Sequence, residues 1–181
     1  VSSAASDVYK RQNNGLLREG KSSIYEGGNR VPFAMQWTGE ISQMVYDYPI
    51  SSLDILPTIA ELTNATIEEN NPLDGVNIIP FLKGSKKGRP HTTLYVRKFD
   101  DDLYSVRDGD MKLVTKKKNT VKELYNLDKD IGEVNNLADF FPKEVQRLDS
   151  ILQTWDTQLI DPVFLGLIHT ERWQKRLNEN P

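Results

Sequence analysis

The sequence predicts an α/β chain that continues into a small antiparallel β-sheet packed by a C-terminal helix. Three observations support this fold class. The apolar run at residues 31–37 follows a glycine-rich loop and is typical of a buried strand. Residues 92–127 are β-branched and aromatic stretches joined by turn dipeptides, Asp108-Gly109 above all, which is typical of antiparallel hairpins. After Pro142, apolar residues recur at helical spacing.

Composition narrows the classes of function. The 181 residues have room for one domain, or for a domain and a subdomain. The net charge is only -3 with both signs mixed, so neither nucleic acid nor an anionic membrane surface is expected as a partner. The absence of cysteine excludes disulfides, thiolate zinc sites and a cysteine nucleophile within these residues. No apolar run is long enough for a membrane span, and any export signal is expected upstream.

The segment "YPISSLDILPTIAELTNAT" predicts a helix with Ser51 or Ser52 as N-cap and Asp54 in its first turn. A short apolar turn is expected next, ending at Gly84. The helix after Pro142 is expected to cover the sheet with one apolar face, which consists of Leu148, Ile151, Leu152, Trp155 and Leu159.

The chain is divided at composition changes. Residues 1–12 are small and polar without a period, so we treat them as a non-native or artefactual segment. Residues 13–88 form the α/β part, which ends in the broken polar stretch "SKKGRP". Residues 89–159 form the sheet and helix subdomain, and residues 160–181 form a C-terminal tail.

The stretch "LLREGKSSIYEGGNRVPF", residues 16–33, is the candidate functional loop. Lys21 is flanked by small residues and glycines, and a compact cation in such a loop suits a doubly negative tetrahedral anion. Arg18 or Arg30 would add planar donors. The alternative is that Lys21 is an ordinary surface lysine. We also expect Glu26 to pair with Arg30 across the glycine turn as scaffold.

Other polar residues have simpler interpretations. His91 and His169 lack metal-ligand spacing, so each is expected to be structural. The acidic runs at residues 100–102 and 108–110 lack the pattern of a calcium loop and are expected to form turns. Trp155 and Trp173 are expected in packing roles rather than in a pocket.

Five segments also carry a resemblance: "NNGLLREGKSSIYEGGNRVPFAMQW", "SSLDILPTIAELTN", "LDGVNIIPFLKG", "LYSVRDGDMKLV" and "ELYNLDKDIGEVNNLA". In this order they resemble the C-terminal part of type I sulfatases of the arylsulfatase group, over roughly residues 13–155. The resemblance implies the end of an alkaline-phosphatase-like catalytic domain over residues 13–88. It also implies that Lys21 is the catalytic, substrate-binding lysine that contacts the sulfate group.

The resemblance further implies a sulfuric ester hydrolase that uses calcium and a formylglycine nucleophile, and a sulfated small molecule or glycan as substrate. The nucleophile motif Cys/Ser-x-Pro-x-Arg is absent here, and the calcium ligands are expected upstream, so no metal residue is assigned. Asn14-Gly15 lacks the preceding aspartate of the family's metal motif. The 181-residue chain alone is therefore expected to be inactive, and the whole enzyme is expected to be periplasmic, extracellular or otherwise exported.

Two alternatives remain open. One is a phosphatase or phosphodiesterase of the same superfamily, which would use the same kind of sheet with a divalent metal. The other is a non-catalytic saccharide-binding module that uses the exposed face of residues 92–127 or the lysines at 116–118.

Overall fold

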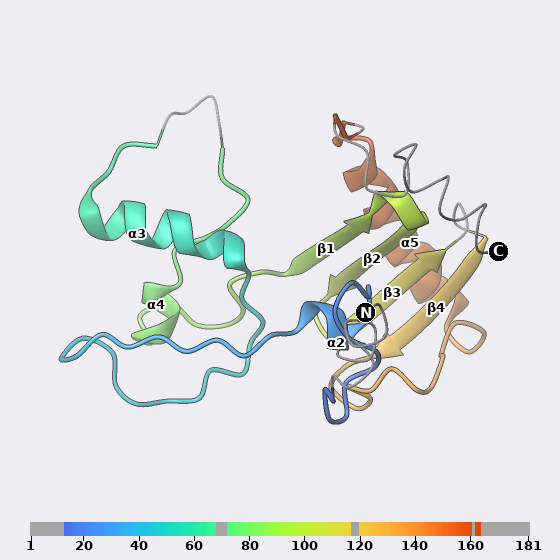
Figure 1. The fold of residues 1–181 in the computed structure, drawn as a ribbon, viewed down its shortest axis with the longest axis horizontal. Helices are drawn as coiled ribbons and strands as arrows, with labels where there is room; N and C mark the ends of the chain where they lie inside the picture. The colour runs from blue at the N-terminus through green and yellow to red at the C-terminus, as the bar shows by residue number, and fades with distance from the viewer. Residues whose placement is uncertain (1–12, 68–71, 117–119, 161, 164–181) are drawn as a thin grey trace, which may run out of the picture. The chain divides into compact units, whose positions relative to one another are not determined.

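The computed structural model describes residues 13–67, 72–116, 120–160 and 162–163 (Figure 1). The chain forms two compact units, one made of residues 32–92 and the other of the residues up to Val31 together with those from Thr93 onward. The division at residues 88 and 89 that the sequence suggested stays a prediction. None of the described helices is long and apolar enough to cross a membrane.

The second of these units is built on a four-stranded antiparallel sheet in the order β1-β2-β3-β4. Its strands are β1 (Thr93–Lys98), β2 (Leu103–Asp108), β3 (Met111–Lys116) and β4 (Val121–Asn126). The β2–β3 turn contains Gly109 at φ 62°, a backbone conformation that glycine adopts without steric cost. A 3₁₀ turn, η2 (Phe99–Asp101), joins β1 to β2. The hairpins and the turn role of both acidic runs are thus confirmed.

The sheet is covered on both faces (Figure 1). Helix α5 (Pro142–Asp156) packs on one face, where the buried cluster is Val106, Leu113, Leu124, Leu148 and Leu152. The short helix α2 (Glu26–Asn29) and the loop before it lie on the other face, where the buried cluster is Ile24, Tyr25, Val114, Tyr125 and Leu127. Alternate residues of β3 and β4 therefore serve two separate cores.

Helix α5 begins as the sequence predicts, but it ends at Asp156, so Leu159 of the predicted apolar face lies beyond the helix. Pro142 occupies its first turn, where a missing N–H costs nothing, and Leu148 and Leu152 are buried one helical turn apart. Near the C-terminal end, the ring of Trp155 stacks on Tyr95 of β1, with centroids 4.7 Å apart and planes at 10°. Trp155 is a packing residue, as expected.

In the described part of the unit of residues 32–92, the regular elements are all helical and most of the remaining chain is turn or irregular. A 3₁₀ turn, η1 (Ser52–Asp54), leads into α3 (Ile55–Thr63), and a second short helix, α4 (Ile79–Leu82), follows. Ser51 is the N-cap: its hydroxyl accepts from the Leu53 N–H, and Asp54 accepts from the Ser51 N–H at 2.8 Å. The chain then leaves α4 through Gly84 at φ 72°.

The strand predicted over residues 31–37 is wrong. These residues carry no strand pairing, and Val31, Phe33 and Met35 are exposed. A strand requires a neighbour for its backbone N–H and C=O groups, and the described part of this unit contains no strand at all. Apolar side chains along η1 and α3 are also exposed, including Leu53 in η1 and Leu56 and Ile59 in α3.

Candidate functional site

Lys21 lies at the exposed tip of a tight turn on the α2 side of the sheet. The turn closes when the Ser23 N–H donates to the carbonyl of Gly20 at 2.9 Å, and Ser22 adopts a left-handed conformation at φ 74°. A positive φ at a non-glycine residue is uncommon and persists where the surroundings fix it. The turn therefore presents the lysine to solvent from a defined backbone.

The glycine pair after the turn is explained by close backbone approach. A Cβ on Gly27 would lie 2.3 Å from the Arg18 carbonyl oxygen, and one on Gly28 would lie 2.2 Å from the Ser23 carbonyl oxygen. Both distances are far below contact, and both neighbours are backbone atoms that have little freedom to move. The two glycines let α2 pack directly against the Lys21 turn.

Asn14 braces the same turn from outside. Its side-chain Nδ2 donates to the carbonyl of Glu19 at 2.7 Å and to that of Gly27 at 3.1 Å. Asn14 thereby joins Glu19, just before the Gly20–Ser23 turn, to Gly27 in α2. Sequence reasoning considered Asn14 only as part of a metal motif and missed this role.

Arg18 supports the structure rather than adding an anion donor beside Lys21. Its Nη1 donates to the Tyr125 hydroxyl and to the carbonyl of Glu133, both at 2.8 Å. Its guanidinium also lies 3.8 Å from the centre of the Tyr25 ring, within cation–π range. Arg18 was predicted to offer planar donors to an anion, but its Nη1 group is used within the protein instead.

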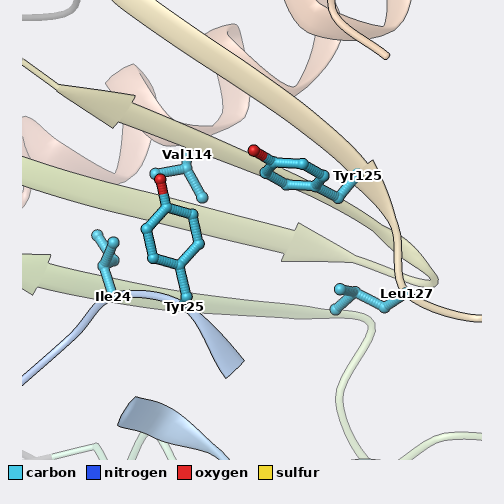
Figure 2. Close-up of a cluster of buried hydrophobic side chains, with 5 residues drawn as sticks. All are labelled: Ile24, Tyr25, Val114, Tyr125 and Leu127. Atoms are coloured by element: carbon cyan, nitrogen blue, oxygen red, sulfur yellow. The ribbon is translucent and has the colours of Figure 1, made fainter. Parts of the chain in front are cut away.

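Two tyrosines and Glu123 form a hydrogen-bonded cluster beside Arg18 (Figure 2 shows both rings). The hydroxyls of Tyr25 and Tyr125 both donate to Glu123 Oε2, and Lys116 donates to Oε1 at 2.8 Å. Burial together with the carboxylate raises the pKa of both tyrosines. Burial alone would raise the pKa of Glu123, but the bonds from Lys116 and the tyrosines outweigh it and hold this pKa below its usual value.

A buried ionic triad lies under α2. Lys112 Nζ is 2.9 Å from Glu26 Oε1 and 2.9 Å from Glu133 Oε1, and the three side chains are between 0% and 9% exposed. Glu133 Oε2 also accepts from the Glu26 N–H at 2.7 Å. Burial raises the pKa of Glu133, while the charge of Lys112 opposes the shift. The predicted pairing of Glu26 with Arg30 is wrong, because Lys112 takes the Glu26 carboxylate.

The remaining candidates lie elsewhere or are not metal sites. The described residues hold no group of three or more His, Cys, Asp and Glu side chains that would bind a metal ion. His91 contacts the buried carboxylate of Asp54 at 2.7 Å within the unit of residues 32–92, which is a structural role. His169, Trp173 and the basic residues 117–118 lie outside the described part of the chain.

Comparison with known proteins covers the same region. Residues 19–159 match the family model described as "N-sulphoglucosamine sulphohydrolase, C-terminal". The chain is 28% identical to "Uncharacterized sulfatase YdeN" of Escherichia coli in an alignment 176 residues long that covers 77% of this chain and 31% of that protein. It is 40% identical to arylsulfatase A of Bos taurus over 102 residues, 55% of this chain and 20% of that protein.

Solved structures agree on the fold. The structure described as "Ps i-CgsB in complex with k-i-k-neocarrahexaose" superposes with a TM-score of 0.76 at 27% identity, over 96% of this chain and 39% of that chain. The Bacteroides thetaiotaomicron structure described as "Metabolism of multiple glycosaminoglycans … (BT33336S-sulf)" gives a TM-score of 0.70 at 22% identity, over 85% of this chain and 35% of that chain. The predicted fold class, the C-terminal part of an alkaline-phosphatase-like sulfatase fold, is confirmed, and the chain spans well under half of the length of these relatives.

Proposed function

Because the chain belongs to the N-sulphoglucosamine sulphohydrolase C-terminal family, we propose that it is the C-terminal part of a sulfuric ester hydrolase in which Lys21 contacts the substrate sulfate. The observation that carries the proposal is the braced turn that presents Lys21. The family match begins at residue 19, so it includes this turn. The proposal concerns the full-length protein, of which this chain supplies one part.

Lys21 suits this role on electrostatic grounds. Sulfate-ester cleavage develops negative charge on the sulfuryl and leaving-group oxygens, and a positioned ammonium stabilises that charge without needing to reorganise. The residue at the tip of the turn is exposed, so Lys21 lies at the surface of this unit. The fixed backbone around Ser22 and Ser23 reduces the entropy that is lost when the lysine engages an anion.

The other parts of the chemistry come from elsewhere in the proposed enzyme. The family implies calcium and a formylglycine nucleophile, but the described residues offer no metal-binding group and the chain has no nucleophile motif. In the proposed enzyme, both groups would be supplied by other parts of the full-length protein. It follows that this chain alone is expected to show no ester hydrolysis, and that the proposed full-length enzyme is exported like its family.

A sulfated glycan is the substrate class that we propose. The solved relative with a TM-score of 0.76 is described in complex with neocarrahexaose, and it matches 96% of this chain. A sulfated aryl ester shares the reacting group but not the sugar, so the two substrates separate sulfate recognition from sugar recognition. Comparing them tests the substrate class.

The test is Lys21→Ala in the full-length protein. We expect kcat/KM for sulfate esters to fall by about 30- to 1000-fold, equivalent to the 2–4 kcal/mol that loss of one oxyanion donor costs. Lys143→Ala is the matched control, because Lys143 is an exposed lysine at the start of α5, on the other face of the sheet. An unchanged kcat/KM in Lys21→Ala would refute the assignment.

The same assay separates the two alternatives. A wild-type protein that prefers phosphate esters over sulfate esters would be a phosphoester hydrolase of the same superfamily. Saccharide binding with no ester cleavage in the full-length protein would indicate a binding module.

A further inference from the structure

We propose that Glu133 positions Lys21, because the two chain segments that enter and leave the Lys21 turn are both bonded to this one residue. Glu133 is a positioning residue and not a catalytic one. The inference rests on the proposed role of Lys21 for its effect on turnover, but the contacts that carry it are independent of that role.

The entering segment is held through the backbone of Glu133. Arg18, three residues before Lys21, donates from Nη1 to the Glu133 carbonyl oxygen at 2.8 Å. A second approach lies beside it: a Cβ on Gly132 would stand 2.9 Å from the carbonyl oxygen of Leu16. The entering segment and the 132–133 backbone are therefore in direct contact at two points.

The leaving segment is held through the side chain of Glu133. The backbone N–H of Glu26, five residues after Lys21, donates to Oε2 at 2.7 Å. Lys112 on β3 neutralises the same carboxylate and also binds the side chain of Glu26, at 2.9 Å in both cases. This fixes the start of α2 on the sheet, and the Lys21 turn spans the gap between the two anchored segments.

Glu133 is itself held rigidly enough to serve as an anchor. Its side chain is fully buried, and its backbone is left-handed at φ 52°. Its N–H donates to the carbonyl of Asp130 at 3.1 Å, and the Asp130 carboxylate accepts from the N–H groups of Val134 and Asn135. Local bonds thus shape the 130–135 loop before it meets either segment.

The consequence concerns placement rather than charge. Glu133→Gln retains the Lys21 ammonium but removes the carboxylate charge that Lys112 and the Glu26 N–H both contact, so it weakens the hold on the leaving segment. Catalysis by a positioned charge falls steeply with small displacements, because reacting groups must be held close to the productive geometry. Glu133 is therefore expected to affect sulfate-ester turnover only while Lys21 is present.

The experiment is a double-mutant cycle in the full-length protein with Glu133→Gln, Lys21→Ala and the double variant. We expect Glu133→Gln to lower kcat/KM for a sulfate ester about tenfold, mainly through kcat, and the double variant to be no slower than Lys21→Ala. If the fold-losses in kcat/KM of the two single variants multiply in the double variant, the proposal is overturned, because Glu133 would then act independently of Lys21. Glu144→Gln, which breaks an ion pair with Arg147 on the α5 face, is the control and should leave kcat/KM unchanged.

Hydrogen exchange separates this proposal from the proposed function. In Glu133→Gln, peptides that cover residues 19–28 should exchange faster, while α5 peptides should not change. If these peptides exchange faster in Glu133→Gln but Lys21→Ala leaves kcat/KM unchanged, the anchoring role of Glu133 is supported and the role of Lys21 in hydrolysis is refuted. Unchanged exchange alongside an impaired Lys21→Ala would overturn the anchor and leave the sulfatase role intact. If Glu133→Gln does not fold, Glu133→Asp, which keeps the charge but shortens the side chain, takes its place in both measurements.

Discussion

Lys112→Met tests how strongly the buried triad stabilises the sheet unit. Lys112 is 3% exposed and is the cation that both Glu26 and Glu133 contact at 2.9 Å. Methionine keeps the length and the apolar stem of the side chain and removes only the charge and its hydrogen bonds. The variant therefore leaves two buried carboxylates without their lysine.

The expected loss is large because the partners that remain are buried. Removing one member of a buried ion pair costs about 3–5 kcal/mol. Lys122→Met is the matched control: Lys122 lies on the neighbouring strand β4 and makes one 2.8 Å ion pair with Asp149, with side chains 30% and 19% exposed. An ion pair of that exposure is worth about 0.2–1 kcal/mol. The two substitutions should differ by at least about 2 kcal/mol.

The assay is a urea titration of the full-length protein, read by hydrogen exchange in peptides that cover β2 and β3. With a urea slope of about 2 kcal/mol per molar, Lys112→Met should lower the local unfolding midpoint by about 1.5–2.5 M. Lys122→Met should lower it by about 0.5 M or less.

Equal midpoints for the two variants would refute the reasoning. They would show that the carboxylates of Glu26 and Glu133 tolerate burial without the lysine. Glu133 offers a route to that tolerance, because burial already raises its pKa and favours the protonated form. Repeating the titration at higher pH removes this explanation, because Glu133 is then ionised. The fall in the unfolding midpoint of Lys112→Met relative to wild type should then be larger.

Two further substitutions test the surroundings of the turn. In Gly28→Ala, the added Cβ would meet the Ser23 carbonyl oxygen at 2.2 Å, so peptides covering residues 19–28 should exchange much faster. Gly39→Ala is the control: it strains a backbone at φ 83° in the unit of residues 32–92, but its Cβ meets no atom, so it should leave the 19–28 peptides unchanged. Glu123 has a lowered pKa in the folded chain, so its stabilising contribution is present above the unfolded value of 4.5 and is lost as the pH falls through the folded value. Acid unfolding below pH 4.5 should accordingly be shallower in Glu123→Gln than in wild type, and an identical acid profile would contradict the assignment.

Local signals in the sequence predicted the local structure well. Asp108-Gly109 marks the central hairpin, Pro142 the start of α5 and Ser51 the start of η1, and all three are confirmed. In each case the cause lies within a few residues of the effect. The strand over residues 31–37 failed because its formation depends on a neighbouring strand, which a local apolar run does not reveal.

The supports of the site were beyond the reach of local reasoning. Glu26 was expected to pair with Arg30, four positions away, but its partner is Lys112, 86 positions away. Arg18 and Glu133 are 115 positions apart. A sequence read by spacing favours near partners, and only the fold shows that β3 and the 130–135 loop pass beneath the turn. Glu26, Lys112 and Glu133 lie far apart in the sequence, so no spacing between them indicates that they meet.

The same long separations affect the order in which the molecule assembles. Contacts between residues far apart in sequence carry a large loop-closure entropy, so they form late unless other structure first brings them together. The Lys21 turn closes onto residues made more than eighty positions later, after β3, β4 and the loop to Glu133 have left the ribosome. A product that stops before Glu133 would contain Lys21 and every glycine of its loop, yet it would lack the two bonds that join the flanking segments to Glu133. The turn that we propose to bind the sulfate therefore gains its supports from Glu133 and Lys112 only in a chain whose C-terminal sheet has been completed.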